Sequence, residues 1–557
     1  MRFRQPRDSS ARSARSGRAD RWVAVVGALA ALIVVAQIVA AFVGLSASSF
    51  WLDELFTVWV VNVPDTATLG AHILADVHPP LYYVLTFAWS RFAGLSEAGL
   101  RLFSALLASL AVLVVVFGAG RPVRWPARVL AGAIAATSTF WIDHSQDARM
   151  YALGLLLGGV LAVITIAVGE RQRRTSPVPA SLLAAFAGVA TLFAFTHFYM
   201  FLTAGGAILI LLFRSRLWRD RVALASIGSA ILLAMSAYIA LLLGHTSVDV
   251  QDTWFQTDVE FFLTQARDGL LSQIWLPVQC ILFVMVVWLV ARAKRLGHLW
   301  DDVRVQRSLL MVSVVSFVLL AGIASSLLIA PSFSGRNIAV VAPFLWIAVA
   351  QLIDLSLDDT RSPLGLALPG ALIFALAFVG VRQSDRLVPQ REEFRAAGRA
   401  VAAIPACRSR PIPIALNASA SIGPLMLDQL HRTFEHYLPA SVPETPFVRV
   451  SADHRAQLDP GARALIADRM AGADPCPVLA MAVHPGGVTP EQIAAALSRI
   501  GGRADSSAVR TVTFAHRSEG SWLPGLEDDA NAWLFLAGRR TPERTRVPSG
   551  TPTGGSM

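Results

Sequence analysis

The sequence has almost no lysine and few charged residues of any kind. Lys294 is the one lysine, so arginine supplies nearly all of the 48 basic residues, and charged residues make up 15% of the 557 positions. Soluble globular proteins average about 25% charged residues, whereas 54% of this chain is hydrophobic. The scarcity of charge excludes an ordinary soluble enzyme and indicates an integral membrane protein with a soluble part.

Several familiar motifs are also missing. The sequence has no G-x-G-x-x-G after a strand, no phosphate-binding P-loop and no nucleophile elbow. Their absence argues against a nucleotide donor bound on a doubly wound domain. The net charge of +10 comes from arginines that stand between apolar runs. Membrane topology therefore explains the basic excess, and we expect no nucleic-acid partner.

Cysteine is scarce, with three residues in the chain. Cys280 lies within an apolar run, where we expect a packed apolar side chain. Cys407 and Cys476 each precede a predicted strand, and outside the cell such a pair could form a disulfide. The sequence leaves open whether these two cysteines are bridged or remain free thiols.

The sequence is rich in long uncharged runs. Residues 22–45 carry no charge, and at about 1.5 Å per residue they can cross a hydrocarbon core about 30 Å thick. This run is too long for a signal peptide, and the arginine-rich residues 1–21 before it are typical of a disordered cytoplasmic tail. Eleven spans are predicted, at 22–45, 98–119, 126–142, 150–169, 179–197, 200–213, 222–245, 274–293, 306–330, 337–357 and 363–381.

The arginines between these spans predict the topology. By the positive-inside rule the basic loops lie in the cytoplasm, and these are 121–128, 171–174, 214–221 and 291–307. The external loops are then 46–97, 139–149, 246–273 and 331–336. Segment 78–92 is also apolar, but a span there would move every later basic loop outside. We therefore expect 78–92 to lie in or dip into the outer membrane interface.

The composition changes after residue 381, where glycine, proline and charges become more frequent. Strand-like runs alternate with helical patterns, which favours a small α/β domain. The strand-like runs are 411–416, 447–451, 477–484, 509–514 and 532–538, and the helical ones are 391–404, 420–435 and 490–500. The predicted fold class is a polytopic α-helical membrane protein of about eleven transmembrane helices, with a large first external loop and a C-terminal external α/β domain. Its parts are a cytoplasmic tail at 1–21, a transmembrane domain at 22–381, the external domain at 382–540 and a disordered tail at 541–557.

Two acids stand side by side in the first external loop, in the stretch SSFWLDELFTVW. Asp53 and Glu54 lie among aromatic and aliphatic residues just after the first span. Ionisable residues next to hydrocarbon are costly and commonly functional. Alternatively, the two acids begin an interfacial helix, where they favour the positive end of the helix dipole, with Ser48 or Ser49 as its cap. The residues alone leave these two interpretations about even.

Further ionisable residues stand later in the first external loop and in other external loops. In DVHPPLYY, Asp76, His78 and Tyr82 surround two prolines that end a helix and favour an extended turn. His197 and Arg336 lie at two more outer membrane edges. A lone edge arginine is usually an anchor, but several such residues at one membrane face favour a shared cavity.

The stretch STFWIDHSQDARMYAL adds a third loop. If it is helical, Asp143, Asp147 and Tyr151 share one face at a spacing of four residues. Arg149 would then point elsewhere.

Taken in order, WLDELFT, HPPLYY and QDARMY resemble motifs of membrane glycosyltransferases of the C superfamily. The similarity is greatest to the bacterial relatives of protein O-mannosyltransferases and lipid A aminoarabinose transferases, and it covers about residues 20–380. It implies a donor sugar carried on polyprenyl phosphate and a glycan, lipid or protein hydroxyl as acceptor. It also implies reaction at the outer face of the plasma membrane, with inversion at the anomeric carbon.

The resemblance implies a role for most of the singled-out residues. Asp53 corresponds to the general base, and Glu54 to a helper that orients the acceptor. Arg149 and Arg336 are the candidates to stabilise the leaving phosphate. His78 stands where relatives have a residue that binds phosphate or a metal. The remaining expected substrate-binding residues are Tyr82, Asp143, Asp147, Tyr151 and His197.

A metal cofactor and two other functions stay open. Glu54, His78 and His197 could hold a divalent ion, although the sequence has no tight ligand spacing. A transporter or flippase of lipid-linked glycans would more typically show paired halves or broken helices near mid-membrane. A structural or sensory protein would use the external domain to bind a partner. Because the ionisable residues gather at one membrane face, the sequence favours the transferase.

Overall fold

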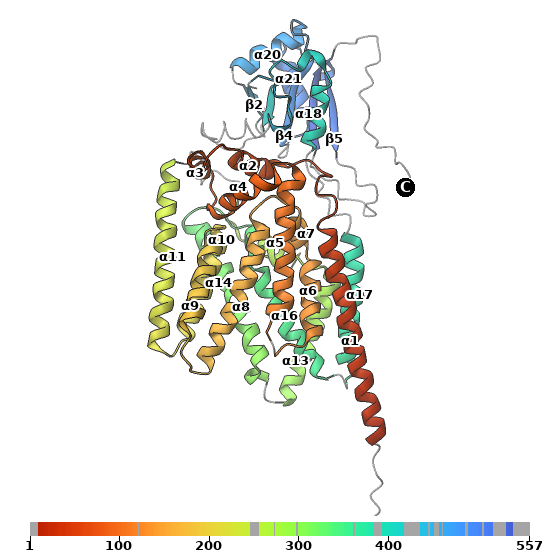
Figure 1. Cartoon of the computed structure of the whole chain (residues 1–557). Helices are drawn as coiled ribbons and strands as arrows, with labels where there is room; N and C mark the ends of the chain where they lie inside the picture. The colour runs from red at the N-terminus through yellow and green to blue at the C-terminus, as the bar shows by residue number, and fades with distance from the viewer. Residues whose placement is uncertain are drawn as a thin grey trace, which may run out of the picture. The chain divides into compact units, whose positions relative to one another are not determined.

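The computed structural model of the chain is mostly helical and contains a small sheet (Figure 1). The residues that it describes are 9–120, 122–245, 255–271, 273–296, 299–359, 362–383, 393–416, 435–443, 446–450, 456–458, 460–484, 488–503, 506–515 and 531–538. The chain forms two compact units. The first comprises 1–46, 60–246 and 250–389, and the second comprises 47–59, 247–249 and 390–557. The segment with Asp53 and Glu54 therefore groups with the C-terminal unit.

The first unit is a bundle of apolar helices (Figure 1). Among the described residues, seven helices are long and apolar enough to cross a membrane, which makes the chain a polytopic membrane protein. Their apolar parts are Arg21–Ala40 of α1 (Ser9–Ala40), α5 (Glu97–Gly118), α8 (Tyr151–Arg173), α11 (Trp218–His245), α14 (Val303–Leu328), Gly335–Ser356 of α15 and α16 (Gly335–Ile338 and Ala342–Ser356, joined by Ala339–Val341), and Pro363–Arg382 of α17 (Pro363–Gln383). The part of the chain that the structure describes also has shorter apolar helices, which are α3 (Thr66–Ala75), α9 (Ala180–Ala194), α10 (Phe198–Arg214) and Leu276–Arg292 of α13 (Leu276–Leu296).

Each predicted span contains helix, and seven of the eleven fall on the seven long apolar helices, but three predictions need correction. The span predicted at 126–142 is broken into α6 (Trp125–Ala136) and α7 (Thr139–Ser145). The break forms because Ser138 accepts from Trp141 N and caps a new helix. Helix α1 begins at Ser9, so helix extends into the predicted tail. The side chain of Cys280 is exposed on α13 and is not packed inside.

Segment 78–92 forms helix α4 (Leu81–Ala93), which is not among the helices that could cross a membrane. Its thirteen residues span about 20 Å at 1.5 Å per residue, too short for a hydrocarbon core of about 30 Å. Helix α3 precedes it, and the two lie across one end of the bundle (Figure 1).

The predicted basic loops meet at one end of this bundle. Asp354 accepts from Nε of Arg124 and from Nη1 of Arg304, each at 2.8 Å. Arg307 Nε donates to Glu170 at the end of α8 (2.8 Å). Asp220 accepts from the backbone of Val178. These contacts join loops that the arginine pattern assigns to one side of the membrane.

The second unit contains a six-stranded mixed sheet in the order β3-β2-β1-β4-β6-β5 (Figure 1). Strand β1 is parallel to both β2 and β4, and the other pairs are antiparallel. The strands are β1 (Ile414–Leu416), β2 (Phe447–Val450), β3 (Ala456–Leu458), β4 (Val478–His484), β5 (Val509–Ala515) and β6 (Asn531–Ala537), and the helices are α18 (Phe394–Ala402), α20 (Pro460–Ala471) and α21 (Pro490–Ile500). The five predicted strands are all present, β3 and α20 were not predicted, and the helix predicted at 420–435 lies outside the described residues apart from Glu435.

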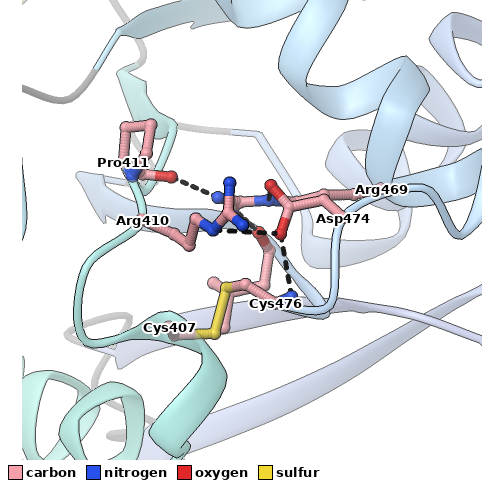
Figure 2. The surroundings of a disulfide bond; sticks show 7 residues. Cys407, Arg410, Pro411, Arg469, Asp474 and Cys476 are labelled. Carbon is pink, nitrogen blue, oxygen red and sulfur yellow. Dashed lines mark hydrogen bonds and ion pairs between the residues drawn. A yellow bond between two sulfur atoms is a disulfide. The ribbon is translucent and has the colours of Figure 1, made fainter.

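A disulfide joins Cys407 and Cys476, with their Cα atoms 4.8 Å apart (Figure 2). It ties the turn before β1 to the turn before β4. Asp474 lies beside it, accepts from Cys476 N (2.9 Å) and faces the buried Arg469 at 3.6 Å. Arg469 also donates to the carbonyl of Pro411 (Figure 2). The bridge therefore fixes the start of the sheet's two central strands, and the bridged alternative for the two cysteines is the one observed.

Candidate functional site

The two acids of the first loop stand in the opening turn of helix α2 (Leu52–Val61). Glu54 is fully buried, and its Oε2 accepts from the backbone N–H of Trp51 (3.2 Å). A glutamate at the third helical position that reaches back in this way is half of a capping box. The helix starts after Trp51, so the cap predicted at Ser48 or Ser49 is wrong. Glu54 thus serves the helix start, and Asp53 precedes it in the same turn.

The HPP turn builds a hydrogen-bonded unit around Asp76. Asp76 follows α3, and its Oδ2 is 3.0 Å from His78 Nδ1 and accepts from Tyr83 Oη at 2.5 Å. Its Oδ1 accepts from Val77 N (2.8 Å). Arg149 Nη1 in turn donates to Tyr83 Oη (3.4 Å). A buried carboxylate is stable when it is paired and hydrogen-bonded in this way.

The charge states around Asp76 follow from these contacts. Burial alone would raise the pKa of Asp76, but the charge and hydrogen bond of His78, followed by the charge of Arg149 and the bond from Tyr83, hold it well below its usual range. Burial and the charge of Asp76 raise the pKa of Tyr83 well above its ordinary value. Asp76 is therefore an anion, and Tyr83 remains a hydroxyl donor.

His78 is held from both sides. Asp76 faces its Nδ1, and Tyr238 Oη of α11 donates to its backbone carbonyl (2.7 Å). A carboxylate on Nδ1 fixes the tautomer and the orientation of an imidazole ring. The ring centroid of His78 lies 5.8 Å from that of His197.

His197 caps the start of α10, where its Nδ1 accepts from Tyr199 N (3.2 Å). Nδ1 is therefore unprotonated, and a neutral ring carries its proton on Nε2. Burial lowers the pKa of His197 well below its ordinary value, and the charges of His78, Arg336 and Arg149 lower it further. His197 is thus a neutral ring among charged neighbours.

The stretch 139–151 is not one helix, which corrects two predictions. Helix α7 ends at Ser145 and α8 begins at Tyr151, so the predicted common face does not exist. Arg149 does not point elsewhere, because it reaches Tyr83 across the break.

The break in 139–151 nevertheless brings its residues together. Gln146 Nε2 donates to Val43 O (2.7 Å), which anchors the irregular turn. The fully buried Asp147 lies 2.7 Å from His144 Nδ1, and the His144 ring is 4.2 Å from that of Tyr151. Asp143 is half-buried on α7.

Arg336 stands on the short helix α15, which Ser334 caps. Its guanidinium carbon lies 5.6 Å from the ring centroid of Tyr151, within cation–π range. The Tyr151 ring is in turn 5.9 Å from His197. Helix α12 (Val259–Leu270) supports α15, because Gln265 Oε1 accepts from Gly335 N (2.7 Å).

These contacts form one polar cluster at a single end of the bundle. We define the polar cluster as Asp76, His78, Tyr83, Arg149, Tyr151, His197 and Arg336. Tyr82 is buried beside it, with its ring 5.9 Å from that of Tyr83, and Asp147 joins through His144. Asp53 and Glu54 belong to the second unit and are not counted in this cluster.

Sequence reasoning left some members of this network out of the candidate site. Asp76 belongs to the DVHPPLYY motif and Tyr83 follows Tyr82 in it, so the same motif could have placed both in the candidate site. His144 likewise stands three residues before Asp147. The sequence around Tyr238 did not indicate a site residue, because its hydrogen bond to the His78 carbonyl depends on the packing of α11.

The described residues contain no group of three His, Cys, Asp or Glu side chains arranged to hold a metal ion. His78 and His197 are neighbours in the first unit, whereas Glu54 belongs to the second. A metal held by these three residues stays a prediction from the sequence.

No family model and no curated protein matches the sequence. Similar solved structures include ArnT from Cupriavidus metallidurans in the apo state, which is 14% identical with a TM-score of 0.47. The same protein bound to undecaprenyl phosphate is 15% identical with a TM-score of 0.45. Each alignment covers 78% of this chain and 94% of the other. Similarity at this level assigns neither a family nor a function to this chain.

Proposed function

We propose that the protein transfers a sugar from a polyprenyl-phosphate carrier to an acceptor hydroxyl. The observation that carries the proposal is the polar cluster. His78, Arg149, His197 and Arg336 come from four separate loops, yet they converge at one end of a membrane helix bundle. Cationic groups and N–H donors are what a phosphate at the end of a lipid tail requires. The three ordered motifs that resemble C-superfamily glycosyltransferases supply the reaction type.

In this reaction Asp53 is the general base. It accepts the proton of the acceptor hydroxyl while that oxygen attacks C1 of the donor sugar. The bond between C1 and the phosphate oxygen breaks as the new glycosidic bond forms, and the anomeric centre inverts. The products are the glycoside and polyprenyl phosphate, which leaves as an anion. Glu54 acts on this step through the helix start that it caps.

The leaving phosphate gains negative charge during transfer, and we assign its stabilisation to Arg149 and Arg336. Asp76 holds His78 through Nδ1, so Nε2 is the nitrogen that His78 can offer to the phosphate. His197 is neutral and contributes an N–H donor from Nε2. The Tyr151 ring contacts both Arg336 and His197.

The orientation is part of the proposal. The basic loops are cytoplasmic, and the polar cluster and the C-terminal unit are external to the plasma membrane. Single cysteines introduced at 122 and within 85–90, in a Cys280→Ser background, test this arrangement with a membrane-impermeant thiol reagent. We expect labelling from outside at 85–90 alone. Labelling of position 122 from outside would reverse the topology.

Purified protein offered a panel of radiolabelled polyprenyl-phosphate sugars tests the reaction. At least one sugar should pass to a lipid, glycan or peptide acceptor, with polyprenyl phosphate released in equal amount. Arg336→Gln should raise the donor KM or lower kcat at least about 10-fold, since an electrostatic donor to the transition state is lost. Arg267→Gln is the matched control. It removes an exposed arginine from the neighbouring helix α12 and should leave turnover unchanged. If no carrier donates its sugar and the protein instead moves the intact donor lipid across vesicle membranes, the result would favour a flippase.

A further inference from the structure

The segment that carries the proposed base belongs structurally to the C-terminal unit. Residues 47–59 group with residues 390–557, although more than 300 positions separate them in the sequence. The first contact is a hydrogen bond from Arg395 Nη2, on α18, to the carbonyl of Ala47 (3.0 Å).

The second contact lies three residues before Asp53. The backbone N–H of Phe50 donates to Tyr437 Oη at 2.8 Å. The Phe50 ring is fully buried, and its centroid lies 5.8 Å from that of His436. Phe50 is therefore held by its backbone and its ring at neighbouring residues of one short 3₁₀ turn, Glu435–Tyr437.

That turn is itself built into the C-terminal unit. It packs on α18 at Gly398, where a Cβ atom would lie 2.1 Å from the carbonyl oxygen of Tyr437. Only glycine permits this approach of helix and turn. Helix α18 buries Phe394, Ala397 and Val401 and contacts strands β4, β5 and β6 of the sheet. A continuous set of contacts thus runs from the sheet to Phe50.

Phe50 is connected to the turn that contains Asp53 and Glu54 through the next residue, Trp51. Trp51 follows Phe50 directly, its N–H donates to Glu54, and its carbonyl accepts from Leu55 N at 2.9 Å. Asp53 lies inside this closed turn, so a shift of Phe50 moves Asp53 with it.

We propose that Tyr437 and Phe50 are positioning residues for Asp53, so that the C-terminal unit sets the place of the catalytic base. This inference deepens the proposed function and rests on it. The C-terminal unit then takes part in catalysis, because it holds the acidic turn itself. Misplacement of a catalytic group by about 1 Å can cost about 10²-fold in rate.

Tyr437→Phe tests the proposal, because it removes the hydroxyl and keeps the ring. We expect faster amide hydrogen exchange at residues 50–56, unchanged exchange in β4 and β6, and a kcat about 10- to 100-fold lower with a donor KM within about twofold of wild type. Thr513→Val removes a hydroxyl from the exposed face of β5 and is the matched control, with wild-type exchange and turnover expected. Gly398→Ala displaces the same turn from the other side and should give the same pattern.

The outcomes separate this inference from the proposed function. Unchanged exchange at 50–56 in both variants would overturn the contact, and faster exchange with wild-type kcat would overturn the positioning role. A rise in donor KM with unchanged kcat would also contradict it, because the role would then be donor binding. If wild-type protein transfers no sugar from any carrier, the proposed function fails, while the exchange data still judge whether Tyr437 holds the acidic turn.

Discussion

Asp76 is the residue whose surroundings define the chemistry of the polar cluster most closely. It is a buried anion that holds His78 through one oxygen and accepts from Tyr83 at the same atom. A buried charge of this kind is retained only when its partners satisfy it. We therefore regard Asp76 as a positioning residue for His78.

Asp76→Asn should lower kcat/KM for the lipid donor about 10-fold or more, because the amide no longer fixes His78 as a carboxylate does. If Asp76 acts through His78, the double variant Asp76→Asn/His78→Gln should be no worse than His78→Gln alone. Steady-state kinetics of the three variants measure this coupling. Additive losses would show that the two residues act independently.

His197 predicts a pH dependence of stability. Its pKa in the folded protein lies well below the unfolded value of about 6.5. Below pH 6.5 the unfolded chain therefore binds more protons than the folded one, and stability falls as the pH drops. This group contributes at most about 1.4 kcal/mol per pH unit. Thermal unfolding in detergent from pH 8 to 5 should show a shallower slope for His197→Gln than for wild type, and parallel curves would contradict the assignment.

At the scale of elements, the support of α15 by α12 determines where Arg336 stands. Gly269 of α12 approaches Gly335 so closely that a Cβ atom at 269 would lie 2.7 Å from the carbonyl oxygen of Gly335. The contact is with backbone, so no side chain can move to relieve it.

Gly269→Ala should therefore push α15 away from α12 and displace Arg336. We expect a several-fold rise in donor KM together with a lower melting temperature. Gly205→Ala is the control, since a Cβ atom there meets no other atom within 4 Å. Wild-type kinetics for Gly269→Ala would show that α15 does not depend on this contact.

The helices could be predicted from the sequence because an uncharged run of about twenty residues has few alternatives to a helix in a membrane. The break after α6 could not be predicted. The hydroxyls of Thr137 and Ser138 donate to the carbonyls of Ala133 and Ala135, so these two polar residues do not interrupt the apolar pattern of the sequence. The second break, at Gln146, likewise depends on a contact with Val43 that is distant in sequence.

The site was predictable where its partners are close in sequence. Asp76 and His78 are two residues apart, and His144 and Asp147 three. The links from Arg149 to Tyr83 and from Tyr238 to His78 arise only from helix packing. The contact of Phe50 with Tyr437 could not be predicted, because the two residues are 387 positions apart in the sequence.

At the scale of the whole molecule, the C-terminal unit is built on a small mixed sheet and is cross-linked by one disulfide. The bridge between Cys407 and Cys476 encloses a loop with a sequence separation of 69 residues. In the chain-entropy model such a loop contributes about 4 kcal/mol to stability. It also fixes the beginnings of β1 and β4, the central strands.

Reduction of this disulfide should lower the unfolding temperature of the C-terminal unit. Cys407→Ser/Cys476→Ser should reproduce the effect, and Cys280→Ser should not, because Cys280 is a free cysteine on α13. Calorimetry with and without reductant measures the difference. An unfolding transition that does not respond to either change would contradict the structural role of the bridge.

The central claim is that Asp53 is the base of a lipid-linked sugar transfer. Asp53→Asn keeps the shape of the side chain and removes its basicity, so kcat should fall about 10²- to 10⁴-fold with normal protein levels. Asp65→Asn is the matched control, because Asp65 is an exposed N-cap of α3 and asparagine caps equally well. The decisive measurement is the transfer rate of both purified variants with the preferred lipid-linked sugar. The account predicts loss of transfer in Asp53→Asn alone, and a wild-type rate in that variant would contradict it.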